Sequence, residues 1–509
     1  MIWARKPIKR PASNYAAFAF AKAQLLASNL RAMRFRSFDL KAALQSENAC
    51  RAEKESVGDY LDEELVLEHE ISLESSGPHV LKVSESSAQA EPGSSPPHLT
   101  ARQRRNRRKT ELKRERRREG ARQRDEHVEI AGYALACAQE ARPYSLDDFD
   151  AASLPISNPG WVGKGDLPKE DLSSIKNLRL FNWKGRDTVA FLDRKDRLWA
   201  LLGAPPPRAK DWEEVNDGLV EAFQKYDQSS TFSKEDMQNR RSGGEYGLRD
   251  EGISFAGGKT RPGNIAVRGI KNRAALKAFS ENRYLGRVLG HTGRLYCTFA
   301  NKLARESRRV FGELQDKFPE IRLPSHPSIG GNYWAARCLN SAGRAKSARV
   351  ITKAHADYGN WAPNWCCVTA VGKFDPDKGG HLVFWNVGLA IRFPPGCSVL
   401  FPSALVTHSN MPIQPGETRY SIVQYSPGGL FRWVYNGHMT DEDFFSSASE
   451  EDLRRWSEDK AGRWKDGLRL FTKWQELLKG DYKGEELGDL SELSELEEDL
   501  ERPAKRRRK

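Results

Sequence analysis

Two histidines and an aspartate in the second half of the chain have the residue types and the spacing of a metal site. His355 and Asp357 are separated by one residue, and His408 follows in the stretch "SALVTHSN". On a β-strand, residues i and i+2 point to the same face, so both side chains can reach one ion. Two imidazoles and one carboxylate leave three positions of an octahedron open, as non-haem Fe(II) oxygenases require. A closed structural zinc site would use four ligands. The three residues are therefore predicted to be metal ligands and the catalytic centre.

Arg419 has the chemistry to hold an acidic cosubstrate beside that metal. Arg419 follows His408 by eleven residues, after a turn signal at 415–416. Its planar guanidinium suits a carboxylate in a bidentate arrangement. Within "RYSIVQY", positions 419, 421, 423 and 425 share one face of a strand. That face is predicted to line the pocket, with Arg419 binding a dicarboxylate cosubstrate.

Other histidines and cysteines offer alternatives to this assignment. A lone His-x-Asp pair is a weak signal, but it is followed here by "GGHL" at 379–382, by the later histidine and by Arg-x-Ser. His381 is a rival ligand, although the apolar residues after it favour a structural role. Cys366 and Cys367 are adjacent to the site; because vicinal thiols do not easily bind one ion, core packing is the favoured interpretation.

The elements around these residues favour an α+β fold. Short apolar runs bounded by Gly or Pro occupy 379–385, 389–393 and 398–402, as expected for strands of a closed antiparallel sheet. A double-stranded β-helix in jelly-roll form accounts for their spacing. A hairpin or meander is predicted over 177–206. Supporting helices are predicted at 211–226 and, with the clearest periodicity, at 293–318, lying across a sheet.

The glycine-rich stretch 242–269 is predicted to be a loop packed near the site. It has no Walker-type lysine and no strand-GxGxxG-helix context, so a nucleotide-binding motif is rejected.

Composition divides the 509 residues into one large domain and flanking tails. The hydrophobic share is 38% and the mean hydropathy is −0.69, which favours disorder in part of the chain. Residues 1–128 are predicted to be largely disordered and to contain a basic block at 101–124, with thirteen Lys/Arg against three Glu. Residues 129–440 form the predicted dioxygenase domain, with its β-helix core at about 325–436. Helices at 441–480 and a charged tail at 481–509, acidic and then basic, complete the chain.

The charged segments bear on partners and on location. The basic block has two interpretations: an element for nuclear import or nucleic-acid binding, or a charged spacer. The terminal "KRRRK" favours nuclear import. The first 36 residues are basic and acid-free, so a mitochondrial transit peptide is the minor alternative. Seven cysteines without a regular framework indicate a reducing compartment and no structural zinc. No apolar run of about 18 residues is present, so no membrane span is predicted.

These motifs resemble the Fe(II)- and 2-oxoglutarate-dependent dioxygenases. The chain is similar, over roughly 170–440, to the fungal branch of the TET/JBP nucleobase oxygenases. The segments that carry this similarity are "GKFDPDKGGHLVFWNVGL", "FPPGCSVLFPSALVTHSN" and "GGLFRW". The resemblance implies a jelly-roll domain in which His355, Asp357 and His408 hold Fe(II). It implies that Arg419 and Ser421 bind the distal carboxylate of 2-oxoglutarate, and that dioxygen is the oxidant.

The same resemblance implies a DNA substrate with modified bases. Asn360 matches the asparagine that contacts a flipped base, and Tyr425 matches a tyrosine that stacks on it. The implied reaction is stepwise oxidation of 5-methylcytosine, as in DNA demethylation, with N6-methyladenine as a second candidate, and block 101–124 would contact part of the DNA. Pro427 stands where the animal enzymes have a base-contacting histidine, and their cysteine-rich zinc region is missing. A protein hydroxylase of the same superfamily and a catalytically dead, transposon-associated binding module remain as alternatives.

Overall fold

The computed structural model describes residues 128–129, 137–165, 178–237, 241, 246–255, 258–326, 333–343, 349–479 and 481–482. The predictions for the N-terminal region before residue 128, including the basic block, and for the charged tail after residue 482 lie outside the described residues. Within the described part, no helix is both long enough and apolar enough to cross a membrane.

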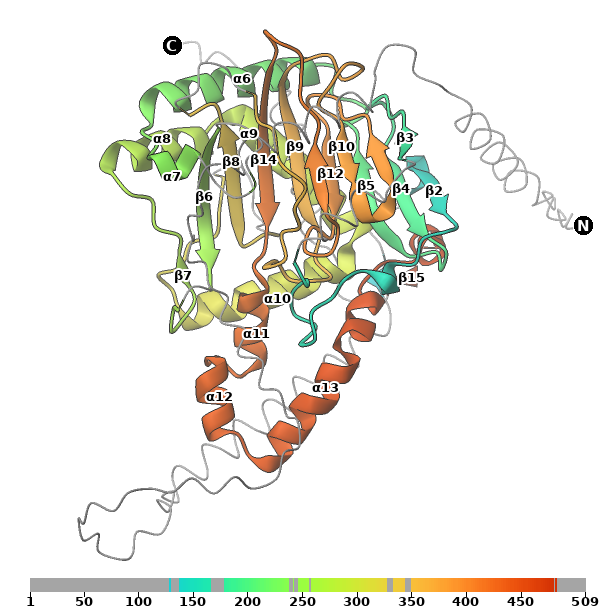
Figure 1. Cartoon of the computed structure of the whole chain (residues 1–509), viewed down its shortest axis with the longest axis vertical. Helices are drawn as coiled ribbons and strands as arrows, with labels where there is room; N and C mark the ends of the chain where they lie inside the picture. Colours follow the sequence, from blue (N-terminus) through green and yellow to red (C-terminus); the bar gives the residue numbers. More distant parts are fainter. Residues whose placement is uncertain are drawn as a thin grey trace, which may run out of the picture.

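Two β-sheets form the centre of the molecule (Figure 1). The larger sheet has the order β2 (Arg142–Leu146), β4 (Val189–Asp193), β5 (Leu198–Gly203), β12 (Ser398–Phe401), β9 (Cys366–Lys373), β14 (Thr418–Tyr425), β8 (Ala336–Ser341), β6 (Gly247–Ser254) and β7 (Gly263–Asn264). The smaller sheet has the order β13 (His408–Asn410), β10 (Leu382–Phe384), β11 (Leu389–Ile391) and β3 (Arg179–Phe181). Neighbouring strands are antiparallel except in the pairs β2–β4 and β3–β11. A separate pair joins β1 (Val128–Glu129) to β15 (Asp481–Tyr482).

Aromatic side chains fill the space between the two sheets. Phe384 of β10 packs on Phe401 of β12, with ring centroids 4.7 Å apart, and on Trp199 of β5, with ring centroids 5.8 Å apart. Every residue of β4, β5 and β12 is buried, as expected for strands covered on both faces. The predicted α+β class is confirmed, and the two packed sheets have a jelly-roll-like arrangement. The larger sheet also contains strands that precede residue 325 in the sequence, namely β2, β4, β5, β6 and β7.

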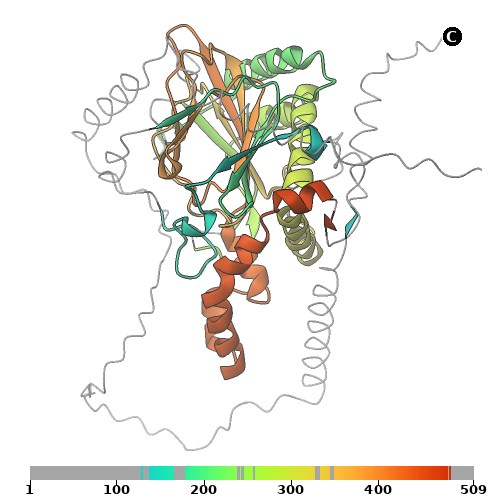
Figure 2. The same ribbon diagram turned by 90° about the vertical axis from the view of Figure 1, so that its right-hand side faces the viewer.

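Helices cover the outer face of the larger sheet, on the side away from the smaller one (Figure 2). They include α6 (Trp212–Ser229), α7 (Lys234–Met237), α8 (Ile270–Ser280), α9 (Arg283–Phe299) and α10 (Asn301–Lys317). Phe223 of α6 stacks on Tyr420 of β14 at a centroid distance of 4.6 Å, which fixes this helix on the sheet. The helix predicted at 211–226 is confirmed. The single helix predicted at 293–318 is wrong, because the backbone leaves the helical region at Ala300 (φ −126, ψ 42) and separates α9 from α10.

The C-terminal helices follow β14, and the first three of them extend below the sheets in Figure 1. They are α11 (Gly428–Tyr435), α12 (Asp441–Ser447), α13 (Glu450–Arg469) and α14 (Trp474–Lys479). The side chain of Thr440 accepts a hydrogen bond from the backbone N–H of Asp443 and so caps the start of α12. Ser449 and Asp452 form a capping box at the start of α13.

The stretch predicted to be only a glycine-rich loop contains two strands. β6 begins at Gly247 and pairs with β8 along its length, and β7 adds to its far side. The sequence of β6, "GLRDEGIS", has little β-propensity, so the partner strand and not local preference stabilises the extended conformation. This edge of the sheet carries residues that matter for the site described below.

Gly252 in β6 offers a test of the observed register. Its φ is +108°, and a Cβ there would meet the backbone oxygen of Ala335. We predict that Gly252→Ala lowers the free energy of unfolding by about 2 kcal/mol or more, through backbone strain and steric conflict. Gly263→Ala is the matched control, because nothing lies within 4 Å of that position and its φ is not positive. Equal denaturation midpoints for the two variants would contradict the register.

Candidate metal centre

Backbone pairing brings the two predicted histidine ligands together. The N–H of His355 donates to the carbonyl of His408 at 3.0 Å, and the N–H of His408 donates back at 2.8 Å. This isolated bridge attaches the segment at 355 to β13, the edge strand of the smaller sheet. The N–H of Asp357 donates to the carbonyl of Ser403 at 2.9 Å. His355 and Asp357 therefore lie outside any regular strand, contrary to the prediction, but their side chains still converge.

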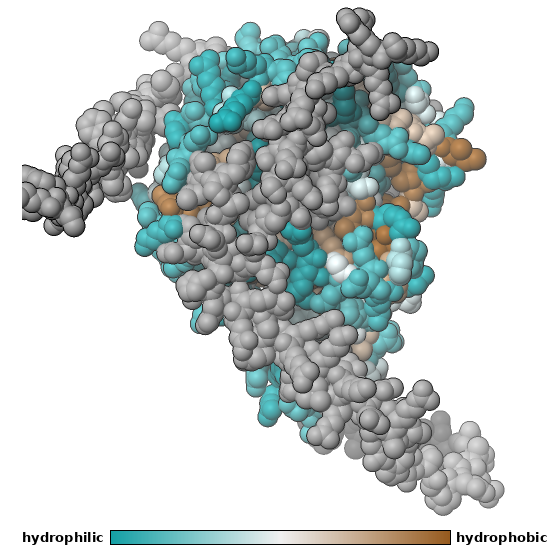
Figure 3. All heavy atoms as spheres, turned by 180° about the vertical axis from the view of Figure 1, so that it is seen from behind, coloured by the Kyte–Doolittle hydropathy of each residue, from teal (hydrophilic) through white to brown (hydrophobic). Residues whose placement is uncertain are grey.

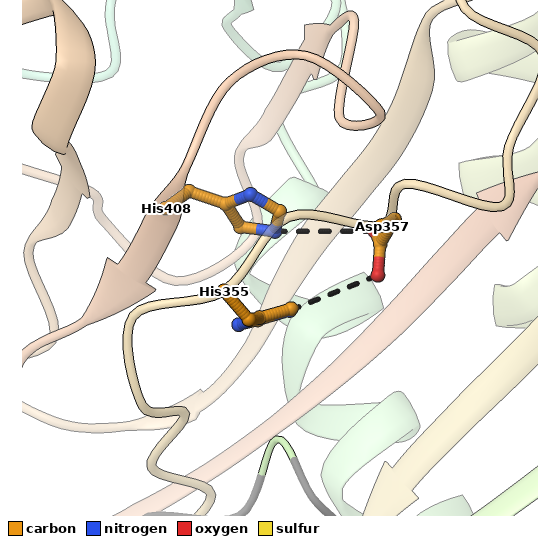
Figure 4. A group of neighbouring side chains, drawn as sticks. All are labelled: His355, Asp357 and His408. Atoms are coloured by element: carbon orange, nitrogen blue, oxygen red, sulfur yellow. Dashed lines mark ion pairs between the residues drawn. The ribbon is translucent and has the colours of Figure 1, made fainter. Parts of the chain in front are cut away.

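The three side chains form a compact and buried cluster (Figure 4). Their ligand atoms all lie within 4.8 Å of one another. Nε2 of His355 lies 3.7 Å from one oxygen of Asp357, and Nε2 of His408 lies 3.9 Å from the other. Within the described part of the chain, this is the one convergent group of three or more His, Cys, Asp or Glu. The carboxylate faces both imidazoles, so the three ligand groups converge on one point, as a shared ion would require.

Hydrogen bonds orient both imidazoles with Nε2 toward the carboxylate. Nδ1 of His355 lies 2.7 Å from the carbonyl of Lys353, and Nδ1 of His408 lies 2.8 Å from that of Val406. A carbonyl can only accept, so each Nδ1 carries the proton and each Nε2 keeps a free lone pair. Burial, with the neighbouring His408 and Arg241, lowers the pKa of His355 to about 3. The ring is neutral at pH 7, which is the form that binds metals.

Asp357 is held in its ionised form. Burial by itself would raise the pKa of this carboxyl, but Arg241 and the two imidazoles hold it at about 2. Nη1 of Arg241 donates to Oδ1 of Asp357 at 2.8 Å. An ionised carboxylate with one oxygen oriented by a hydrogen bond is suited to metal ligation, because outer partners of this kind fix first-shell ligands.

The donor set fits a divalent metal with open positions. Two neutral imidazoles and one carboxylate suit Fe(II) and related ions, and three protein ligands leave room for a chelating cosubstrate. No sulfur belongs to the cluster, although the buried thiol of Cys366 interacts electrostatically with Asp357. His381, the rival ligand, is fully buried in the neighbourhood of Arg392 and Asp377 and is not part of the cluster.

Arg419 is a buried cation on the inner face of β14. Its exposed fraction is 2%, and burial lowers its pKa to about 10. Nη1 donates to the carbonyl of Val350 at a long 3.4 Å, and Nε has no hydrogen-bond partner. No carboxylate of the described residues forms a salt bridge with it. A buried, incompletely bonded guanidinium fits a carboxylate ligand, which would repay the cost of desolvation.

Strand alternation on β14 separates the pocket from the core, as the sequence pattern predicts. Tyr420 and Ile422 pack among the helices on the outer face, whereas Arg419 and Ser421 take the opposite face. The hydroxyl of Ser421 accepts from Nδ2 of Asn340 at 2.9 Å. Both residues predicted to hold the cosubstrate thus lie on one face, and their binding role stays a prediction.

A short chain of contacts connects this face to the metal cluster. The thiol of Cys338 lies 3.5 Å from Oδ1 of Asn340, which in turn bonds Ser421. Cys338 also interacts electrostatically with Arg241, with Asp250 and with Asp357. The carbonyl of Val350 accepts from Nη1 of Arg419 at 3.4 Å and from Nδ2 of Asn410, two residues after His408, at 2.9 Å, so Arg419 lies beside the strand that carries a predicted ligand.

The two predicted base-contacting residues, Asn360 and Tyr425, have different hydrogen-bond partners. Nδ2 of Asn360 donates to the hydroxyl of Ser403 at 3.1 Å, and the residue bridges to Pro427. The phenol of Tyr425 donates to Oδ1 of Asp250 at 3.1 Å. Burial, with Asp250 nearby, raises the pKa of Tyr425, so its hydroxyl stays protonated and remains a donor.

Arg241 and Asp250 are site residues that the sequence pattern did not reveal. Arg241 contacts Asp357 directly and interacts electrostatically with Asp250. Arg241 precedes β6 and Asp250 belongs to it, and the sequence pattern predicted a loop where this strand lies. Neither has a motif around it, and only the pairing of β6 with β8 brings Asp250 beside Tyr425.

Comparisons with known proteins give distant structural similarity. No protein-family model and no curated protein matches the chain. The solved structure of NgTET1 in complex with 5mC DNA aligns with a TM-score of 0.34 and 13% identity, covering 51% of this chain and 88% of that one. The viral collagen prolyl hydroxylase of Paramecium Bursaria Chlorella virus-1, in its 2OG complex, aligns with a TM-score of 0.21 and 10% identity, covering 42% and 89%. Similarity at this level does not assign a function, so the proposals below rest on the site itself.

Removing the carboxylate tests the metal centre. We predict that Asp357→Ala weakens Fe(II) binding by more than about 100-fold, because loss of outer-sphere partners alone costs about 10- to 100-fold. Anaerobic calorimetric titration measures the affinity, and circular dichroism checks the fold. His381→Gln is the control and should still bind one ion. Loss of binding in His381→Gln, with Asp357→Ala unaffected, would mean that the ligands are misassigned.

Proposed function

We propose that this chain is an Fe(II)- and 2-oxoglutarate-dependent dioxygenase that oxidises a methylated base in DNA. Two neighbouring features carry the proposal. The first is the cluster of three ligands, His355, Asp357 and His408, and the second is the buried guanidinium of Arg419, which forms no salt bridge with a carboxylate of the described residues. A structural metal site would use a fourth ligand and would not explain a buried cation beside it. The two features together fit a metal and an anionic cosubstrate.

Each part of the site has a proposed task. Iron bound here would allow dioxygen to oxidise 2-oxoglutarate and the methyl group together, with one oxygen atom passing to succinate, the other to the hydroxylated base, and carbon dioxide released. The three ligands hold the metal, and Arg241 fixes the orientation of Asp357 through its hydrogen bond. Arg419 and Ser421 bind the distal carboxylate. The two packed sheets exclude water from around these charges, which strengthens the interactions inside.

Tyr425 and Asp250 support a nucleobase as the substrate. A base inside a duplex cannot reach a buried metal, so it must be flipped out and held by stacking and by hydrogen bonds to its edge. The ring of Tyr425 offers a stacking face, and the carboxylate of Asp250 can accept from an exocyclic amino group. We propose Asn360 as a further contact to the base. Cytosine and adenine carry such an amino group and thymine does not, so 5-methylcytosine and N6-methyladenine are the candidate bases.

The proposed DNA substrate implies a nuclear protein. The basic segments at 101–124 and 505–509 fit nuclear import and contact with phosphates. A protein hydroxylase would keep the same metal and cosubstrate residues, and it would not require a ring and a carboxylate arranged for a base.

Mass spectrometry of methylated DNA tests the proposed reaction. The full chain is incubated with Fe(II), 2-oxoglutarate, ascorbate and duplexes containing 5-methylcytosine or N6-methyladenine. We expect a nucleoside one oxygen atom heavier than the methylated substrate, together with succinate, and neither product with Asp357→Ala. Succinate formation that is stimulated only by a peptide, with unchanged DNA, would favour the protein hydroxylase instead.

Replacing Arg419 tests the cosubstrate site with two opposite effects. Arg419→Met removes a buried charge that lacks an anionic partner, so the protein without 2-oxoglutarate should keep or raise its thermal midpoint. The same change should weaken 2-oxoglutarate binding by about 2 to 5 kcal/mol, or at least about 30-fold.

Arg337→Met is the matched control for Arg419→Met. Arg337 is equally buried but is bonded to Glu251. Its loss removes the cation from the partly buried carboxylate of Glu251, so it should destabilise the protein and leave 2-oxoglutarate affinity unchanged. Unaltered 2-oxoglutarate affinity in Arg419→Met would place the cosubstrate elsewhere.

A further inference from the structure

A hairpin at 156–163 holds the segment that carries Asn360. A bridge between Ile156 and Gly163 closes this hairpin. Two backbone hydrogen bonds of 2.9 Å each join it to the segment at 358–362, from the N–H of Gly163 to the carbonyl of Tyr358 and from the N–H of Ala362 to the carbonyl of Trp161. The hairpin therefore fixes the backbone on both sides of Asn360.

The end of β14 contacts the same segment. Asn360 bridges to Pro427, which follows Tyr425 by two residues. Gly428, the first residue of α11, has no room for a side chain, because a Cβ there would lie 2.8 Å from a methyl carbon of Val162 in the hairpin. The hairpin, the segment with Asn360 and the end of the strand with Tyr425 are thus packed together.

Asn360 lies beside the metal cluster. Its backbone N–H donates to the carbonyl of Asp357 at 2.8 Å. Its Nδ2 donates to the hydroxyl of Ser403, and the carbonyl of Ser403 accepts from the N–H of Asp357 at 2.9 Å. A shift of the segment 358–362 would therefore move Asn360 relative to the cluster, whereas Asp357 keeps its own backbone bond.

Arg463 of α13 attaches the hairpin to the C-terminal helices. Its guanidinium carbon lies over three aromatic rings, 4.4 Å from the ring centroid of Trp161, 5.0 Å from that of Tyr435 and 5.6 Å from that of Trp456. Nη1 donates to the carbonyl of Pro159 in the hairpin. The three rings, called the cage below, come from the hairpin, from α11 and from α13, so one cation joins three elements.

The cage faces inward, around this cation. In Figure 1 the hairpin, drawn in teal, lies between α11 and α13. Most of the fully exposed residues of α13 are charged, and Figure 3, a view from behind, shows mainly hydrophilic surface where the lower part of the molecule is coloured. Trp161 itself is only 7% exposed.

Few buried side chains hold α13 on the domain. Of its twenty residues, all of them described, only Gly467 is buried. The indole N–H of Trp464 donates to the carbonyl of Ala152 at 3.2 Å. Cation–π contacts strengthen when the cation is removed from water, so the contacts of Arg463 contribute strongly to this attachment. The hairpin that they hold is the one that fixes Asn360.

We propose that Arg463 is a positioning residue for the base pocket, acting through the hairpin 156–163. The inference rests on the proposed function, in which Asn360 and Tyr425 contact the flipped base. Through the ring of Trp161, Arg463 holds the segment with Asn360. Through the ring of Tyr435, it holds α11, the helix that follows β14 and its Tyr425. Loss of this cation would loosen the two base contacts relative to each other and would remove no ligand of the metal or the cosubstrate.

Replacement of the cation in the full chain tests this inference. Arg463→Gln removes the charge, and Arg463→Lys keeps the charge but loses the planar guanidinium. Arg287→Gln is the matched control, because Arg287 lies 5.5 Å from the ring centroid of Trp212 and also pairs with Asp211, on the outer face of the larger sheet. Steady-state kinetics on a methylated duplex and amide hydrogen exchange are measured for each variant.

For Arg463→Gln we expect the KM for the methylated duplex to rise about 5- to 30-fold with kcat nearly unchanged, as when a binding contact is weakened. Amide exchange at Gly163 and Ala362 should rise by a similar factor, because their hydrogen bonds join the hairpin to the segment. Arg463→Lys should give intermediate values for the KM and for exchange. Fe(II) affinity, 2-oxoglutarate affinity and succinate formation without DNA should not change.

Arg287→Gln should lower the thermal midpoint and leave the KM for DNA and both amides unchanged. An equal rise of that KM in Arg287→Gln would indicate general destabilisation and would overturn the inference. Unchanged exchange at Gly163 and Ala362 in Arg463→Gln would overturn it too, while oxidation of methylated DNA by the wild type keeps the proposed function. Weaker Fe(II) binding with an unchanged KM for DNA would mean that Arg463 acts on the metal ligands instead. A wild type that does not oxidise DNA removes both proposals.

Discussion

The reciprocal pair of backbone hydrogen bonds between His355 and His408 is the interaction on which the site depends. It joins two segments that are far apart in the sequence and places both imidazoles at the edge of the smaller sheet. Asp357 is positioned two residues later, by its own backbone bond to Ser403. If this bridge were lost, the cluster could not form, because no regular strand holds His355 or Asp357. Packing of the two sheets against each other maintains the bridge.

Two buried charges near this bridge are stabilised in opposite ways. The negative charge of Asp357 is matched within the chain by Arg241 and by two neutral imidazoles with their Nε2 atoms turned inward. The positive charge of Arg419 is left without a carboxylate among the described residues, and burial lowers its pKa to about 10. Burying the Arg419 guanidinium without a partner destabilises the folded chain, and a bound anion would offset that desolvation cost. The difference between Asp357 and Arg419 therefore favours an anionic cosubstrate over a purely structural role.

Sequence patterns predicted the parts of this site that local rules govern. The alternation along β14 follows from strand geometry and agrees with the structure. His355 and Asp357 converge as predicted, although neither lies in a regular strand. The break at Ala300 was missed, because the apolar periodicity continues across it. Arg241 and Asp250 were missed for a different reason: β6 has poor β-propensity and exists through its pairing with β8. Long-range pairing of this kind leaves no signal in the segment itself.

The X-ray absorption spectrum of the Fe(II)-loaded protein tests the central claim most directly, since it reports the atoms around the metal. The account predicts nitrogen and oxygen neighbours only, with scattering from two imidazoles and a coordination number above four, which leaves room for exchangeable ligands. Addition of 2-oxoglutarate should change this shell in the wild type. A sulfur neighbour at about 2.3 Å, or a closed four-ligand shell that 2-oxoglutarate does not alter, would contradict the account.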